Sequence, residues 1–111
     1  PERFFVAETI REKIFLETSK EIPYSTSVVI EQFKERENGK IFISAIVYVE
    51  RKSQRGILVG KRGEMIKHIG QLARVEIEEF VNSPVFLELR VLVKKDWRRS
   101  DRKLKDLGYT S

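Results

Sequence analysis

The sequence predicts an α+β fold in a single domain, residues 1–111, built on a three-stranded mixed sheet. A chain of 111 residues is long enough for one hydrophobic core but too short for two. Apolar residues at helical spacing alternate with strand-like runs in the order α-β-β-α-α-β-α. The first two strands are joined by a hairpin signal, whereas two helices separate the second strand from the third. Such a crossover connection makes the second and third strands parallel.

The N-terminal part, residues 1–27, is expected to be a helix followed by a connector. Val6, Ile10 and Ile14 recur every four residues among charged side chains, which predicts an amphipathic helix over residues 2–18. Residues 19–27 contain Pro23 and several small polar residues, as is typical of a connector.

Two strands are expected over residues 28–36 and 40–51, which are rich in Val, Ile, Phe and Tyr. Asn38-Gly39 between them predicts a tight hairpin turn in which both central residues have positive φ. The second strand is apolar on both alternating faces. We therefore expect it at the centre of the sheet.

Residues 28–94 are expected to form the sheet and the helices on either side of a Gly-x-x-Gly loop. A short helix over residues 53–59 with Ser53 as N-cap precedes Gly60-Lys61-Arg62-Gly63. A longer helix then follows to about residue 81, with Gly70 inside it, and Asn82-Ser83-Pro84 ends it. The third strand, residues 85–94, carries one apolar face and one largely polar face.

Residues 95–111 form the last part, expected to be a basic helix and tail. The helix is predicted over residues 96–107 and ends at Gly108. Trp97 and Leu104 would anchor it to the body of the domain.

The positive charge is concentrated in two segments. The chain has a net charge of +5, but residues 51–74 carry 7 basic residues and 1 acidic residue, net +6. Residues 94–111 carry 7 basic and 3 acidic residues, net +4, and the remainder is acidic. A polyanionic partner would therefore meet the chain at these two segments.

Several function classes have no support in the sequence. There is no cysteine, which excludes a disulfide framework and a thiol nucleophile and suits a reducing cytoplasm. The longest apolar stretch, residues 41–49, is too short to span a bilayer, and no secretion signal opens the chain. Neither a P-loop nor a dinucleotide-binding glycine motif occurs.

The composition also suggests a thermophile as the source. The chain has a high Lys and Arg content and few thermolabile residues, a balance that is common in thermophile proteins.

No catalytic or metal site is expected. His68 is the only histidine, and no cluster of ligand residues lies near it in sequence, so a surface position is expected for it. Glu76, Glu78 and Glu79 are expected to be solubilising side chains on the exposed part of the long helix.

The Gly60-Lys61-Arg62-Gly63 loop is the motif that carries chemistry. A Gly-x-x-Gly between helices is often only a turn. Here two basic residues lie inside it, apolar Ile57, Val59 and Ile66 flank it, and the loop opens a helix whose N-terminal amides favour a phosphate.

The order of elements around this loop resembles the KH-domain core: a strand, a short helix, Gly-Lys-Arg-Gly, a long helix and a strand. The helix and strand that precede this core resemble the type II arrangement, in which the helices pack on one face of the sheet. The opening Pro1-Glu2-Arg3-Phe4-Phe5, the run Glu21-Ile22-Pro23-Tyr24-Ser25, and the terminal Asp96-Trp97-Arg98 are similar to the C-terminal part of the Era-family ribosome-assembly GTPases. The similarity is ordered along nearly the whole chain.

This resemblance implies single-stranded RNA as the partner, namely the 3′ end of 16S-type ribosomal RNA in the small ribosomal subunit. It implies a GTPase domain upstream that holds GTP and Mg, no cofactor in this chain, a monomer, and a cytoplasmic location with peripheral membrane association as a family option. The RNA-binding residues it implies are Ile57, Val59, Gly60, Lys61, Arg62, Gly63, Met65, Ile66 and Lys67. Secondary contacts are expected from Arg55, His68, Lys94, Lys95, Arg98 and Arg99.

Two alternatives remain open at this point. The chain would also suit a type II KH domain of another ribosomal or transcription protein. A different class is a protein-interaction module whose basic C-terminal helix docks on an acidic partner, although such a surface would not need glycines in the loop.

Overall fold

The computed structural model describes residues 1–19 and 21–95. Its helices are α1 (Glu2–Glu17), α2 (Glu21–Tyr24), α3 (Lys52–Val59) and α4 (Glu64–Val81), with a 3₁₀ turn, η1 (Lys61–Gly63), between the last two. The strands are β1 (Thr26–Glu35), β2 (Ile41–Val49) and β3 (Val85–Val93). The expected helix over residues 96–107, with Trp97, Leu104 and Gly108, lies outside the described residues.

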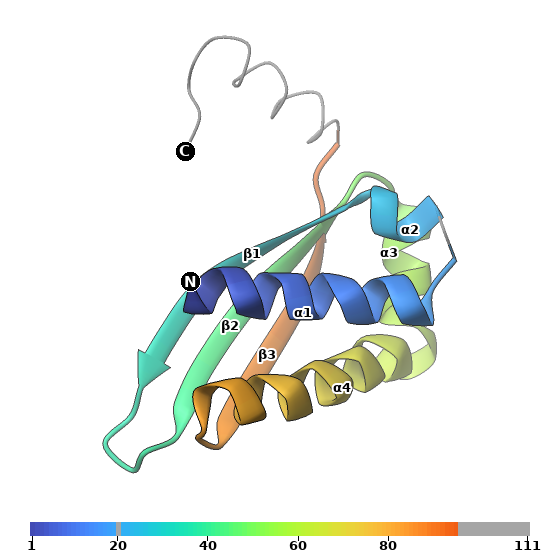
Figure 1. The fold of residues 1–111 in the computed structure, drawn as a ribbon. Helices are drawn as coiled ribbons and strands as arrows, with labels where there is room; N and C mark the ends of the chain where they lie inside the picture. Colours follow the sequence, from blue (N-terminus) through green and yellow to red (C-terminus); the bar gives the residue numbers. More distant parts are fainter. Residues whose placement is uncertain (20, 96–111) are drawn as a thin grey trace, which may run out of the picture.

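The three strands form one mixed sheet in the order β1-β2-β3 (Figure 1). β1 and β2 are antiparallel, and β2 and β3 are parallel in register from Ile41 opposite Val85 to Val49 opposite Val93. The central position of β2 and the parallel crossover are therefore confirmed. Figure 1 shows α1 and α4 lying across the same face of this sheet, while α3 lies near the end of the sheet where β2 stops.

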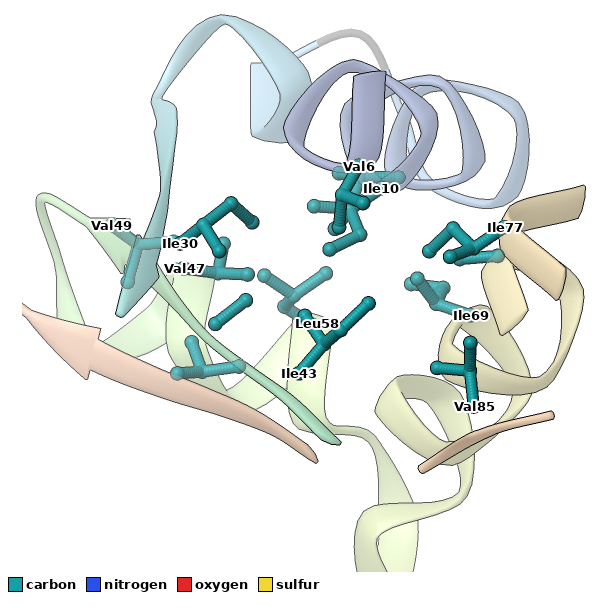
Figure 2. Packing of buried hydrophobic residues seen from close by; sticks show 14 of the residues in the cluster. Val6, Ile10, Ile30, Ile43, Val47, Val49, Leu58, Ile69, Ile77 and Val85 are labelled. Atoms are coloured by element: carbon teal, nitrogen blue, oxygen red, sulfur yellow. The ribbon is translucent and has the colours of Figure 1, made fainter. Parts of the chain in front are cut away.

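The core lies between that face and the two long helices. Alternate residues of β2, from Ile41 through Ile43, Ala45 and Val47 to Val49, are all buried. Figure 2 shows the side chains of Val6 and Ile10 from α1, and of Ile69 and Ile77 from α4, packed against those of the strands. The predicted helical spacing of the apolar residues in both helices is thus used for burial, which drives folding.

The hairpin turn differs from the one predicted. Only Gly39 has positive φ, 82°, while Asn38 does not. The amide of Gly39 donates to the carbonyl oxygen of Arg36, and the Asn38 Oδ1 accepts from the amide of Lys40. The turn is a longer loop ending in a left-handed glycine, because the side chain of Asn38 satisfies the backbone beyond it.

Three further expectations were wrong. The connector after α1 contains the short helix α2, and β1 starts at Thr26, two residues early. Ser53 is not the N-cap of α3: Arg51 is, and the Oε1 of Gln54 accepts the amides of Glu50 and Arg51. Glu78 is not merely solubilising, because its Oε2 accepts the amide of Val85, 2.8 Å away, at the start of β3.

A β-bulge in β1 sets which side chains face the core. The register shifts between Ile30 and Gln32, so Glu31 is the extra residue. Arg3 of α1 donates to the carbonyl oxygen of Ile30 at 2.9 Å. Beyond the bulge Phe33 pairs with Ile43, whose side chain is in the core, and Phe33 packs against the same cluster.

Lys13 links α1 to α4 from a buried position. Its residue is 8% exposed, and its Nζ donates to carboxylate oxygens of Glu12 and of Glu76 on α4. The hydrogen bond to Glu12 and then that to Glu76 raise the pKa of Lys13 above its ordinary 10.5, against the lowering effect of burial. The charged amine is therefore held by the fold.

We expect this contact to make stability fall at alkaline pH. A raised folded-state pKa contributes stability that is complete below pH 10.5 and is lost as pH rises through the folded value. Denaturant unfolding of the wild-type chain and of Lys13→Met should therefore show the wild type losing stability relative to the variant above that pH. A difference between the two proteins that stays constant with pH would contradict this linkage.

Candidate nucleic-acid interface

The glycine loop has a backbone that differs from both helices it joins. The amide of Gly60 donates to the carbonyl oxygen of Gly56 and ends α3, and the amide of Gly63 donates back to Gly60. Gly60 has φ 77° and Gly63 has φ 75°. Both values lie where residues with a Cβ are strained, so two glycines at this spacing allow the chain to turn directly from α3 into α4.

Gly60 is also required by a close approach. A Cβ at this position would lie 2.7 Å from the Cβ of Met65 and 2.9 Å from its backbone nitrogen. Met65 belongs to the first turn of α4 and packs against the core. The first glycine therefore lets the loop lie directly on the start of α4. At Gly63, by contrast, a Cβ would meet open space, so this glycine is required by its φ alone.

Arg62 is held in a left-handed conformation, with φ 56° and ψ 26°. This conformation costs an ordinary residue about 1 kcal/mol or more. A glycine at this position would adopt it without strain. The loop therefore carries local backbone strain at the residue that supplies a cation at its tip.

The cations of the loop are exposed and unneutralised. Lys61, Arg62 and Lys67 are exposed, and within residues 1–19 and 21–95 none of them forms an ion pair. The acidic Glu64 lies in the first turn of α4. Three free cations beside a glycine backbone are suited to binding phosphate groups.

A groove of about 270 Å³ runs beside the loop, between α4 and the edge strand β3. Its apolar part is formed by Ile66, Gly70, Leu87 and Leu89, and Lys67, Gln71 and Arg74 supply its polar part. A Cβ on Gly70 would already lie 3.5 Å from a methyl group of Leu89. This is an ordinary van der Waals distance, so a methyl group would fit at this position, but it would occupy part of the groove between helix and strand.

The structure places the other predicted site residues in different surroundings. Ile66 and Lys67 line the groove, whereas Val59 and Met65 pack against the core and Ile57 is half exposed on α3. Arg55 donates from Nε to the carbonyl oxygen of Val91 and so ties α3 to β3. His68 contacts Glu17, Lys94 lies over the ring of Tyr48, Lys95 is exposed, and Arg98 and Arg99 lie outside the described residues.

The groove residues from β3 and from the second and third turns of α4 were not predicted from the sequence. Gln71 and Arg74 follow Lys67 at spacings of four and seven, a helical stripe that was visible in the sequence. Leu87 and Leu89 were recognised as apolar, but their position opposite this stripe depends on how β3 packs beside α4, which the sequence does not show.

In the described part of the chain, no group of acidic or histidine side chains is arranged to hold a metal ion, and no helix is long and apolar enough to cross a membrane.

A glycine loop with exposed cations that opens a helix beside an apolar groove is the arrangement of a KH-type module. The chain belongs to the KH domain family, which matches residues 21–98. Among curated proteins it is similar to GTPase Era of Geobacter metallireducens, with 57% identity over 111 residues, and to GTPase Era of Carboxydothermus hydrogenoformans, with 51% identity. Each alignment covers 99% of this chain but only 37% of the relative, so the chain spans a little over a third of the length of these proteins.

Two solved structures share the fold. One is an Aquifex aeolicus Era variant bound to GDP and AlF₄⁻, with a TM-score of 0.88 and 36% identity. The other is Era in complex with MgGDPNP and nucleotides 1506–1542 of 16S ribosomal RNA, with the same TM-score and identity. Both matches cover the whole of this chain and 38% and 37% of the respective structures.

We expect Gly60→Ala to destabilise the protein by about 2 kcal/mol or more, because positive φ and contact with Met65 both oppose a Cβ. Gly56→Ala is the matched control: it lies inside α3 with open space around its Cβ, so it should raise stability by up to about 1 kcal/mol. Denaturant unfolding measures both. Equal effects of the two substitutions would contradict the role assigned to Gly60.

Arg62→Gly should separate stability from binding. Removing the left-handed Arg relieves about 1 kcal/mol or more of strain, whereas glycine makes the unfolded chain more flexible and costs up to about 1 kcal/mol, so the free energy of unfolding should change little. Removing the cation should weaken binding to single-stranded RNA at the same time. Thermal unfolding and RNA titration of one protein sample test both; a loss of stability of about 1 kcal/mol or more would show that Arg62 is not strained.

Proposed function

We propose that this chain is the RNA-binding module of an Era-type GTPase and binds the single-stranded 3′ end of small-subunit ribosomal RNA. The observation that carries this proposal is the pair of unneutralised cations, Lys61 and Arg62, held by two glycines next to the groove of α4 and β3. The RNA in the related complex with nucleotides 1506–1542 of 16S ribosomal RNA supports the choice of ligand.

Binding would proceed through two kinds of contact. Backbone groups of the glycine loop, with Lys61, Arg62 and Lys67, hold phosphates and fix the position of the strand without reading its sequence. About four bases then lie along the groove, as in other KH domains. Ile66, Leu87 and Leu89 offer apolar surface, while Gln71 and Arg74 can pair with base edges.

The rest of the function belongs to the longer protein. The relatives are named GTPases, and the solved relatives hold GDP or MgGDPNP. We therefore assign GTP and Mg to a separate domain, and RNA binding without catalysis to this single domain. A protein that binds ribosomal RNA of the small subunit would do so in the cytoplasm.

The double substitution Lys61→Asp/Arg62→Asp should weaken binding to a single-stranded RNA of the ribosomal 3′-end sequence by about 100-fold or more, because two phosphate contacts become repulsive. The unfolding transition should remain, since both side chains are exposed. Fluorescence anisotropy with the intact 111-residue chain measures the affinity, and a duplex RNA of the same length serves as the ligand control.

Arg51→Asp/Lys52→Asp is the matched control variant. It reverses an adjacent, exposed Arg-Lys pair with the same change of net charge, but at the far end of α3. It should reduce affinity only modestly, through long-range electrostatics. The wild type should lose affinity steeply with salt, and the loop variant less steeply. If both double variants bind equally, the loop is not the phosphate site.

A further inference from the structure

An aromatic pair lies on the face of the sheet opposite α1 and α4, at the hairpin end. Phe42 of β2 and Phe86 of β3 are direct partners in the parallel register. Their ring centroids are 5.7 Å apart and their planes differ by 11°, so the rings are stacked. Phe86 is 51% exposed. An exposed ring of this kind leaves a flat apolar surface in contact with water.

Two cations lie over these rings. The guanidinium of Arg36 is 5.0 Å from the centroid of Phe42, and the Nζ of Lys40 is 6.0 Å from that of Phe86. Neither cation forms an ion pair within the described ranges. Both are exposed, so each side chain can move from the ring to an anion.

The same side chains line a hollow of about 390 Å³, completed by Asn38 and Ile41. No carboxylate lines this hollow among the described residues. The Oδ1 of Asn38 already accepts the amide of Lys40, which leaves the NH₂ group of Asn38 as a donor. The hollow therefore offers flat aromatic surface, two mobile cations and one amide donor, while Glu35 and Glu37 line the neighbouring hollow of the hairpin instead.

We propose that this cluster, the hairpin platform of Arg36, Asn38, Lys40, Phe42 and Phe86, binds an unpaired nucleotide of RNA. The base stacks on the rings, and the phosphate is held by Arg36 and Lys40. A nucleotide is the ligand that combines a flat π surface with an adjacent anion. An apolar protein surface would instead leave the two cations buried without partners, at a cost in free energy.

The hairpin platform is separate from the glycine loop. β2 begins at Ile41 beside the platform and ends at Val49, after which the chain continues into α3 and the loop. The length of this strand is roughly 30 Å. Leu87 of the groove directly follows Phe86 along β3, but successive side chains of a strand point to opposite faces of the sheet. Four nucleotides held in the groove on the α4 face are therefore not expected to occupy the platform on the other face. A longer strand that continues past the groove and around the sheet edge would contact both sites.

The test compares a short and a long single-stranded RNA on the intact 111-residue chain. Phe86→Leu keeps an apolar side chain but removes the π face, and Arg36→Gln/Lys40→Gln removes the cations. Each variant should bind an RNA of about 20 nucleotides and mixed sequence about fivefold or more weaker, in line with the loss of one stacked base. Binding of a tetranucleotide should change less than about twofold, because it occupies the loop groove.

Phe15→Leu is the matched control. Phe15 is 55% exposed on α1, and in the described part of the chain it has neither a stacked ring nor a cation over it. It should leave both affinities unchanged, and thermal unfolding should show all variants folded. Unchanged binding of the long RNA by Phe86→Leu would overturn the proposal. Equal weakening of the short and long RNA would overturn it too, because the loss would then lie at the loop.

Discussion

The complete burial of one face of β2 is the constraint on which the other elements depend. A central strand with Ile41, Ile43, Ala45, Val47 and Val49 all buried must have a pairing strand on each side and a layer above it. The hairpin supplies β1, the crossover through α3 and α4 supplies β3, and α1 with α4 forms the layer. Because the crossover must leave β2 at its end and return at its beginning, the glycine loop is fixed at one end of the sheet and the hairpin at the other.

The shape of the glycine loop depends on a close contact between the loop backbone and the start of α4. Gly60 lies so close to Met65 that backbone, rather than a side chain, forms the surface there. The cations can then extend from this surface into solvent instead of covering it. Gly70 has a weaker effect further along α4: a Cβ there would fit at 3.5 Å from Leu89 but would occupy part of the groove. The exposed loop backbone and the open groove, which the proposed function assigns to phosphates and bases, thus both involve a missing Cβ atom.

Within the described residues, local signals in the sequence were sufficient for the three strands, the longer helices and the place of the loop, but not for α2, because each of the former depends on a clear pattern of residues close together in the chain. The hairpin turn was predicted as a two-residue turn, since the sequence does not show that the side chain of Asn38 would satisfy the amide of Lys40. The bulge at Glu31 was not predicted, because no pattern in the sequence indicated it. It nevertheless determines that Phe33 faces the core. The groove and the roles of Glu78, Lys13 and Arg55 depend on contacts between distant segments, which periodicity does not report.

The first helix has a consequence for the boundaries of a transferable unit. The family match begins at residue 21, yet α1 places Val6, Ile10 and Ile14 fully inside the core and joins Lys13 to α4. A graft of the matched segment alone into another protein would carry an apolar surface formerly beneath α1, and such a surface promotes aggregation. For protein engineering, a portable unit of this fold therefore begins at the N-terminal helix rather than at the border of the family match.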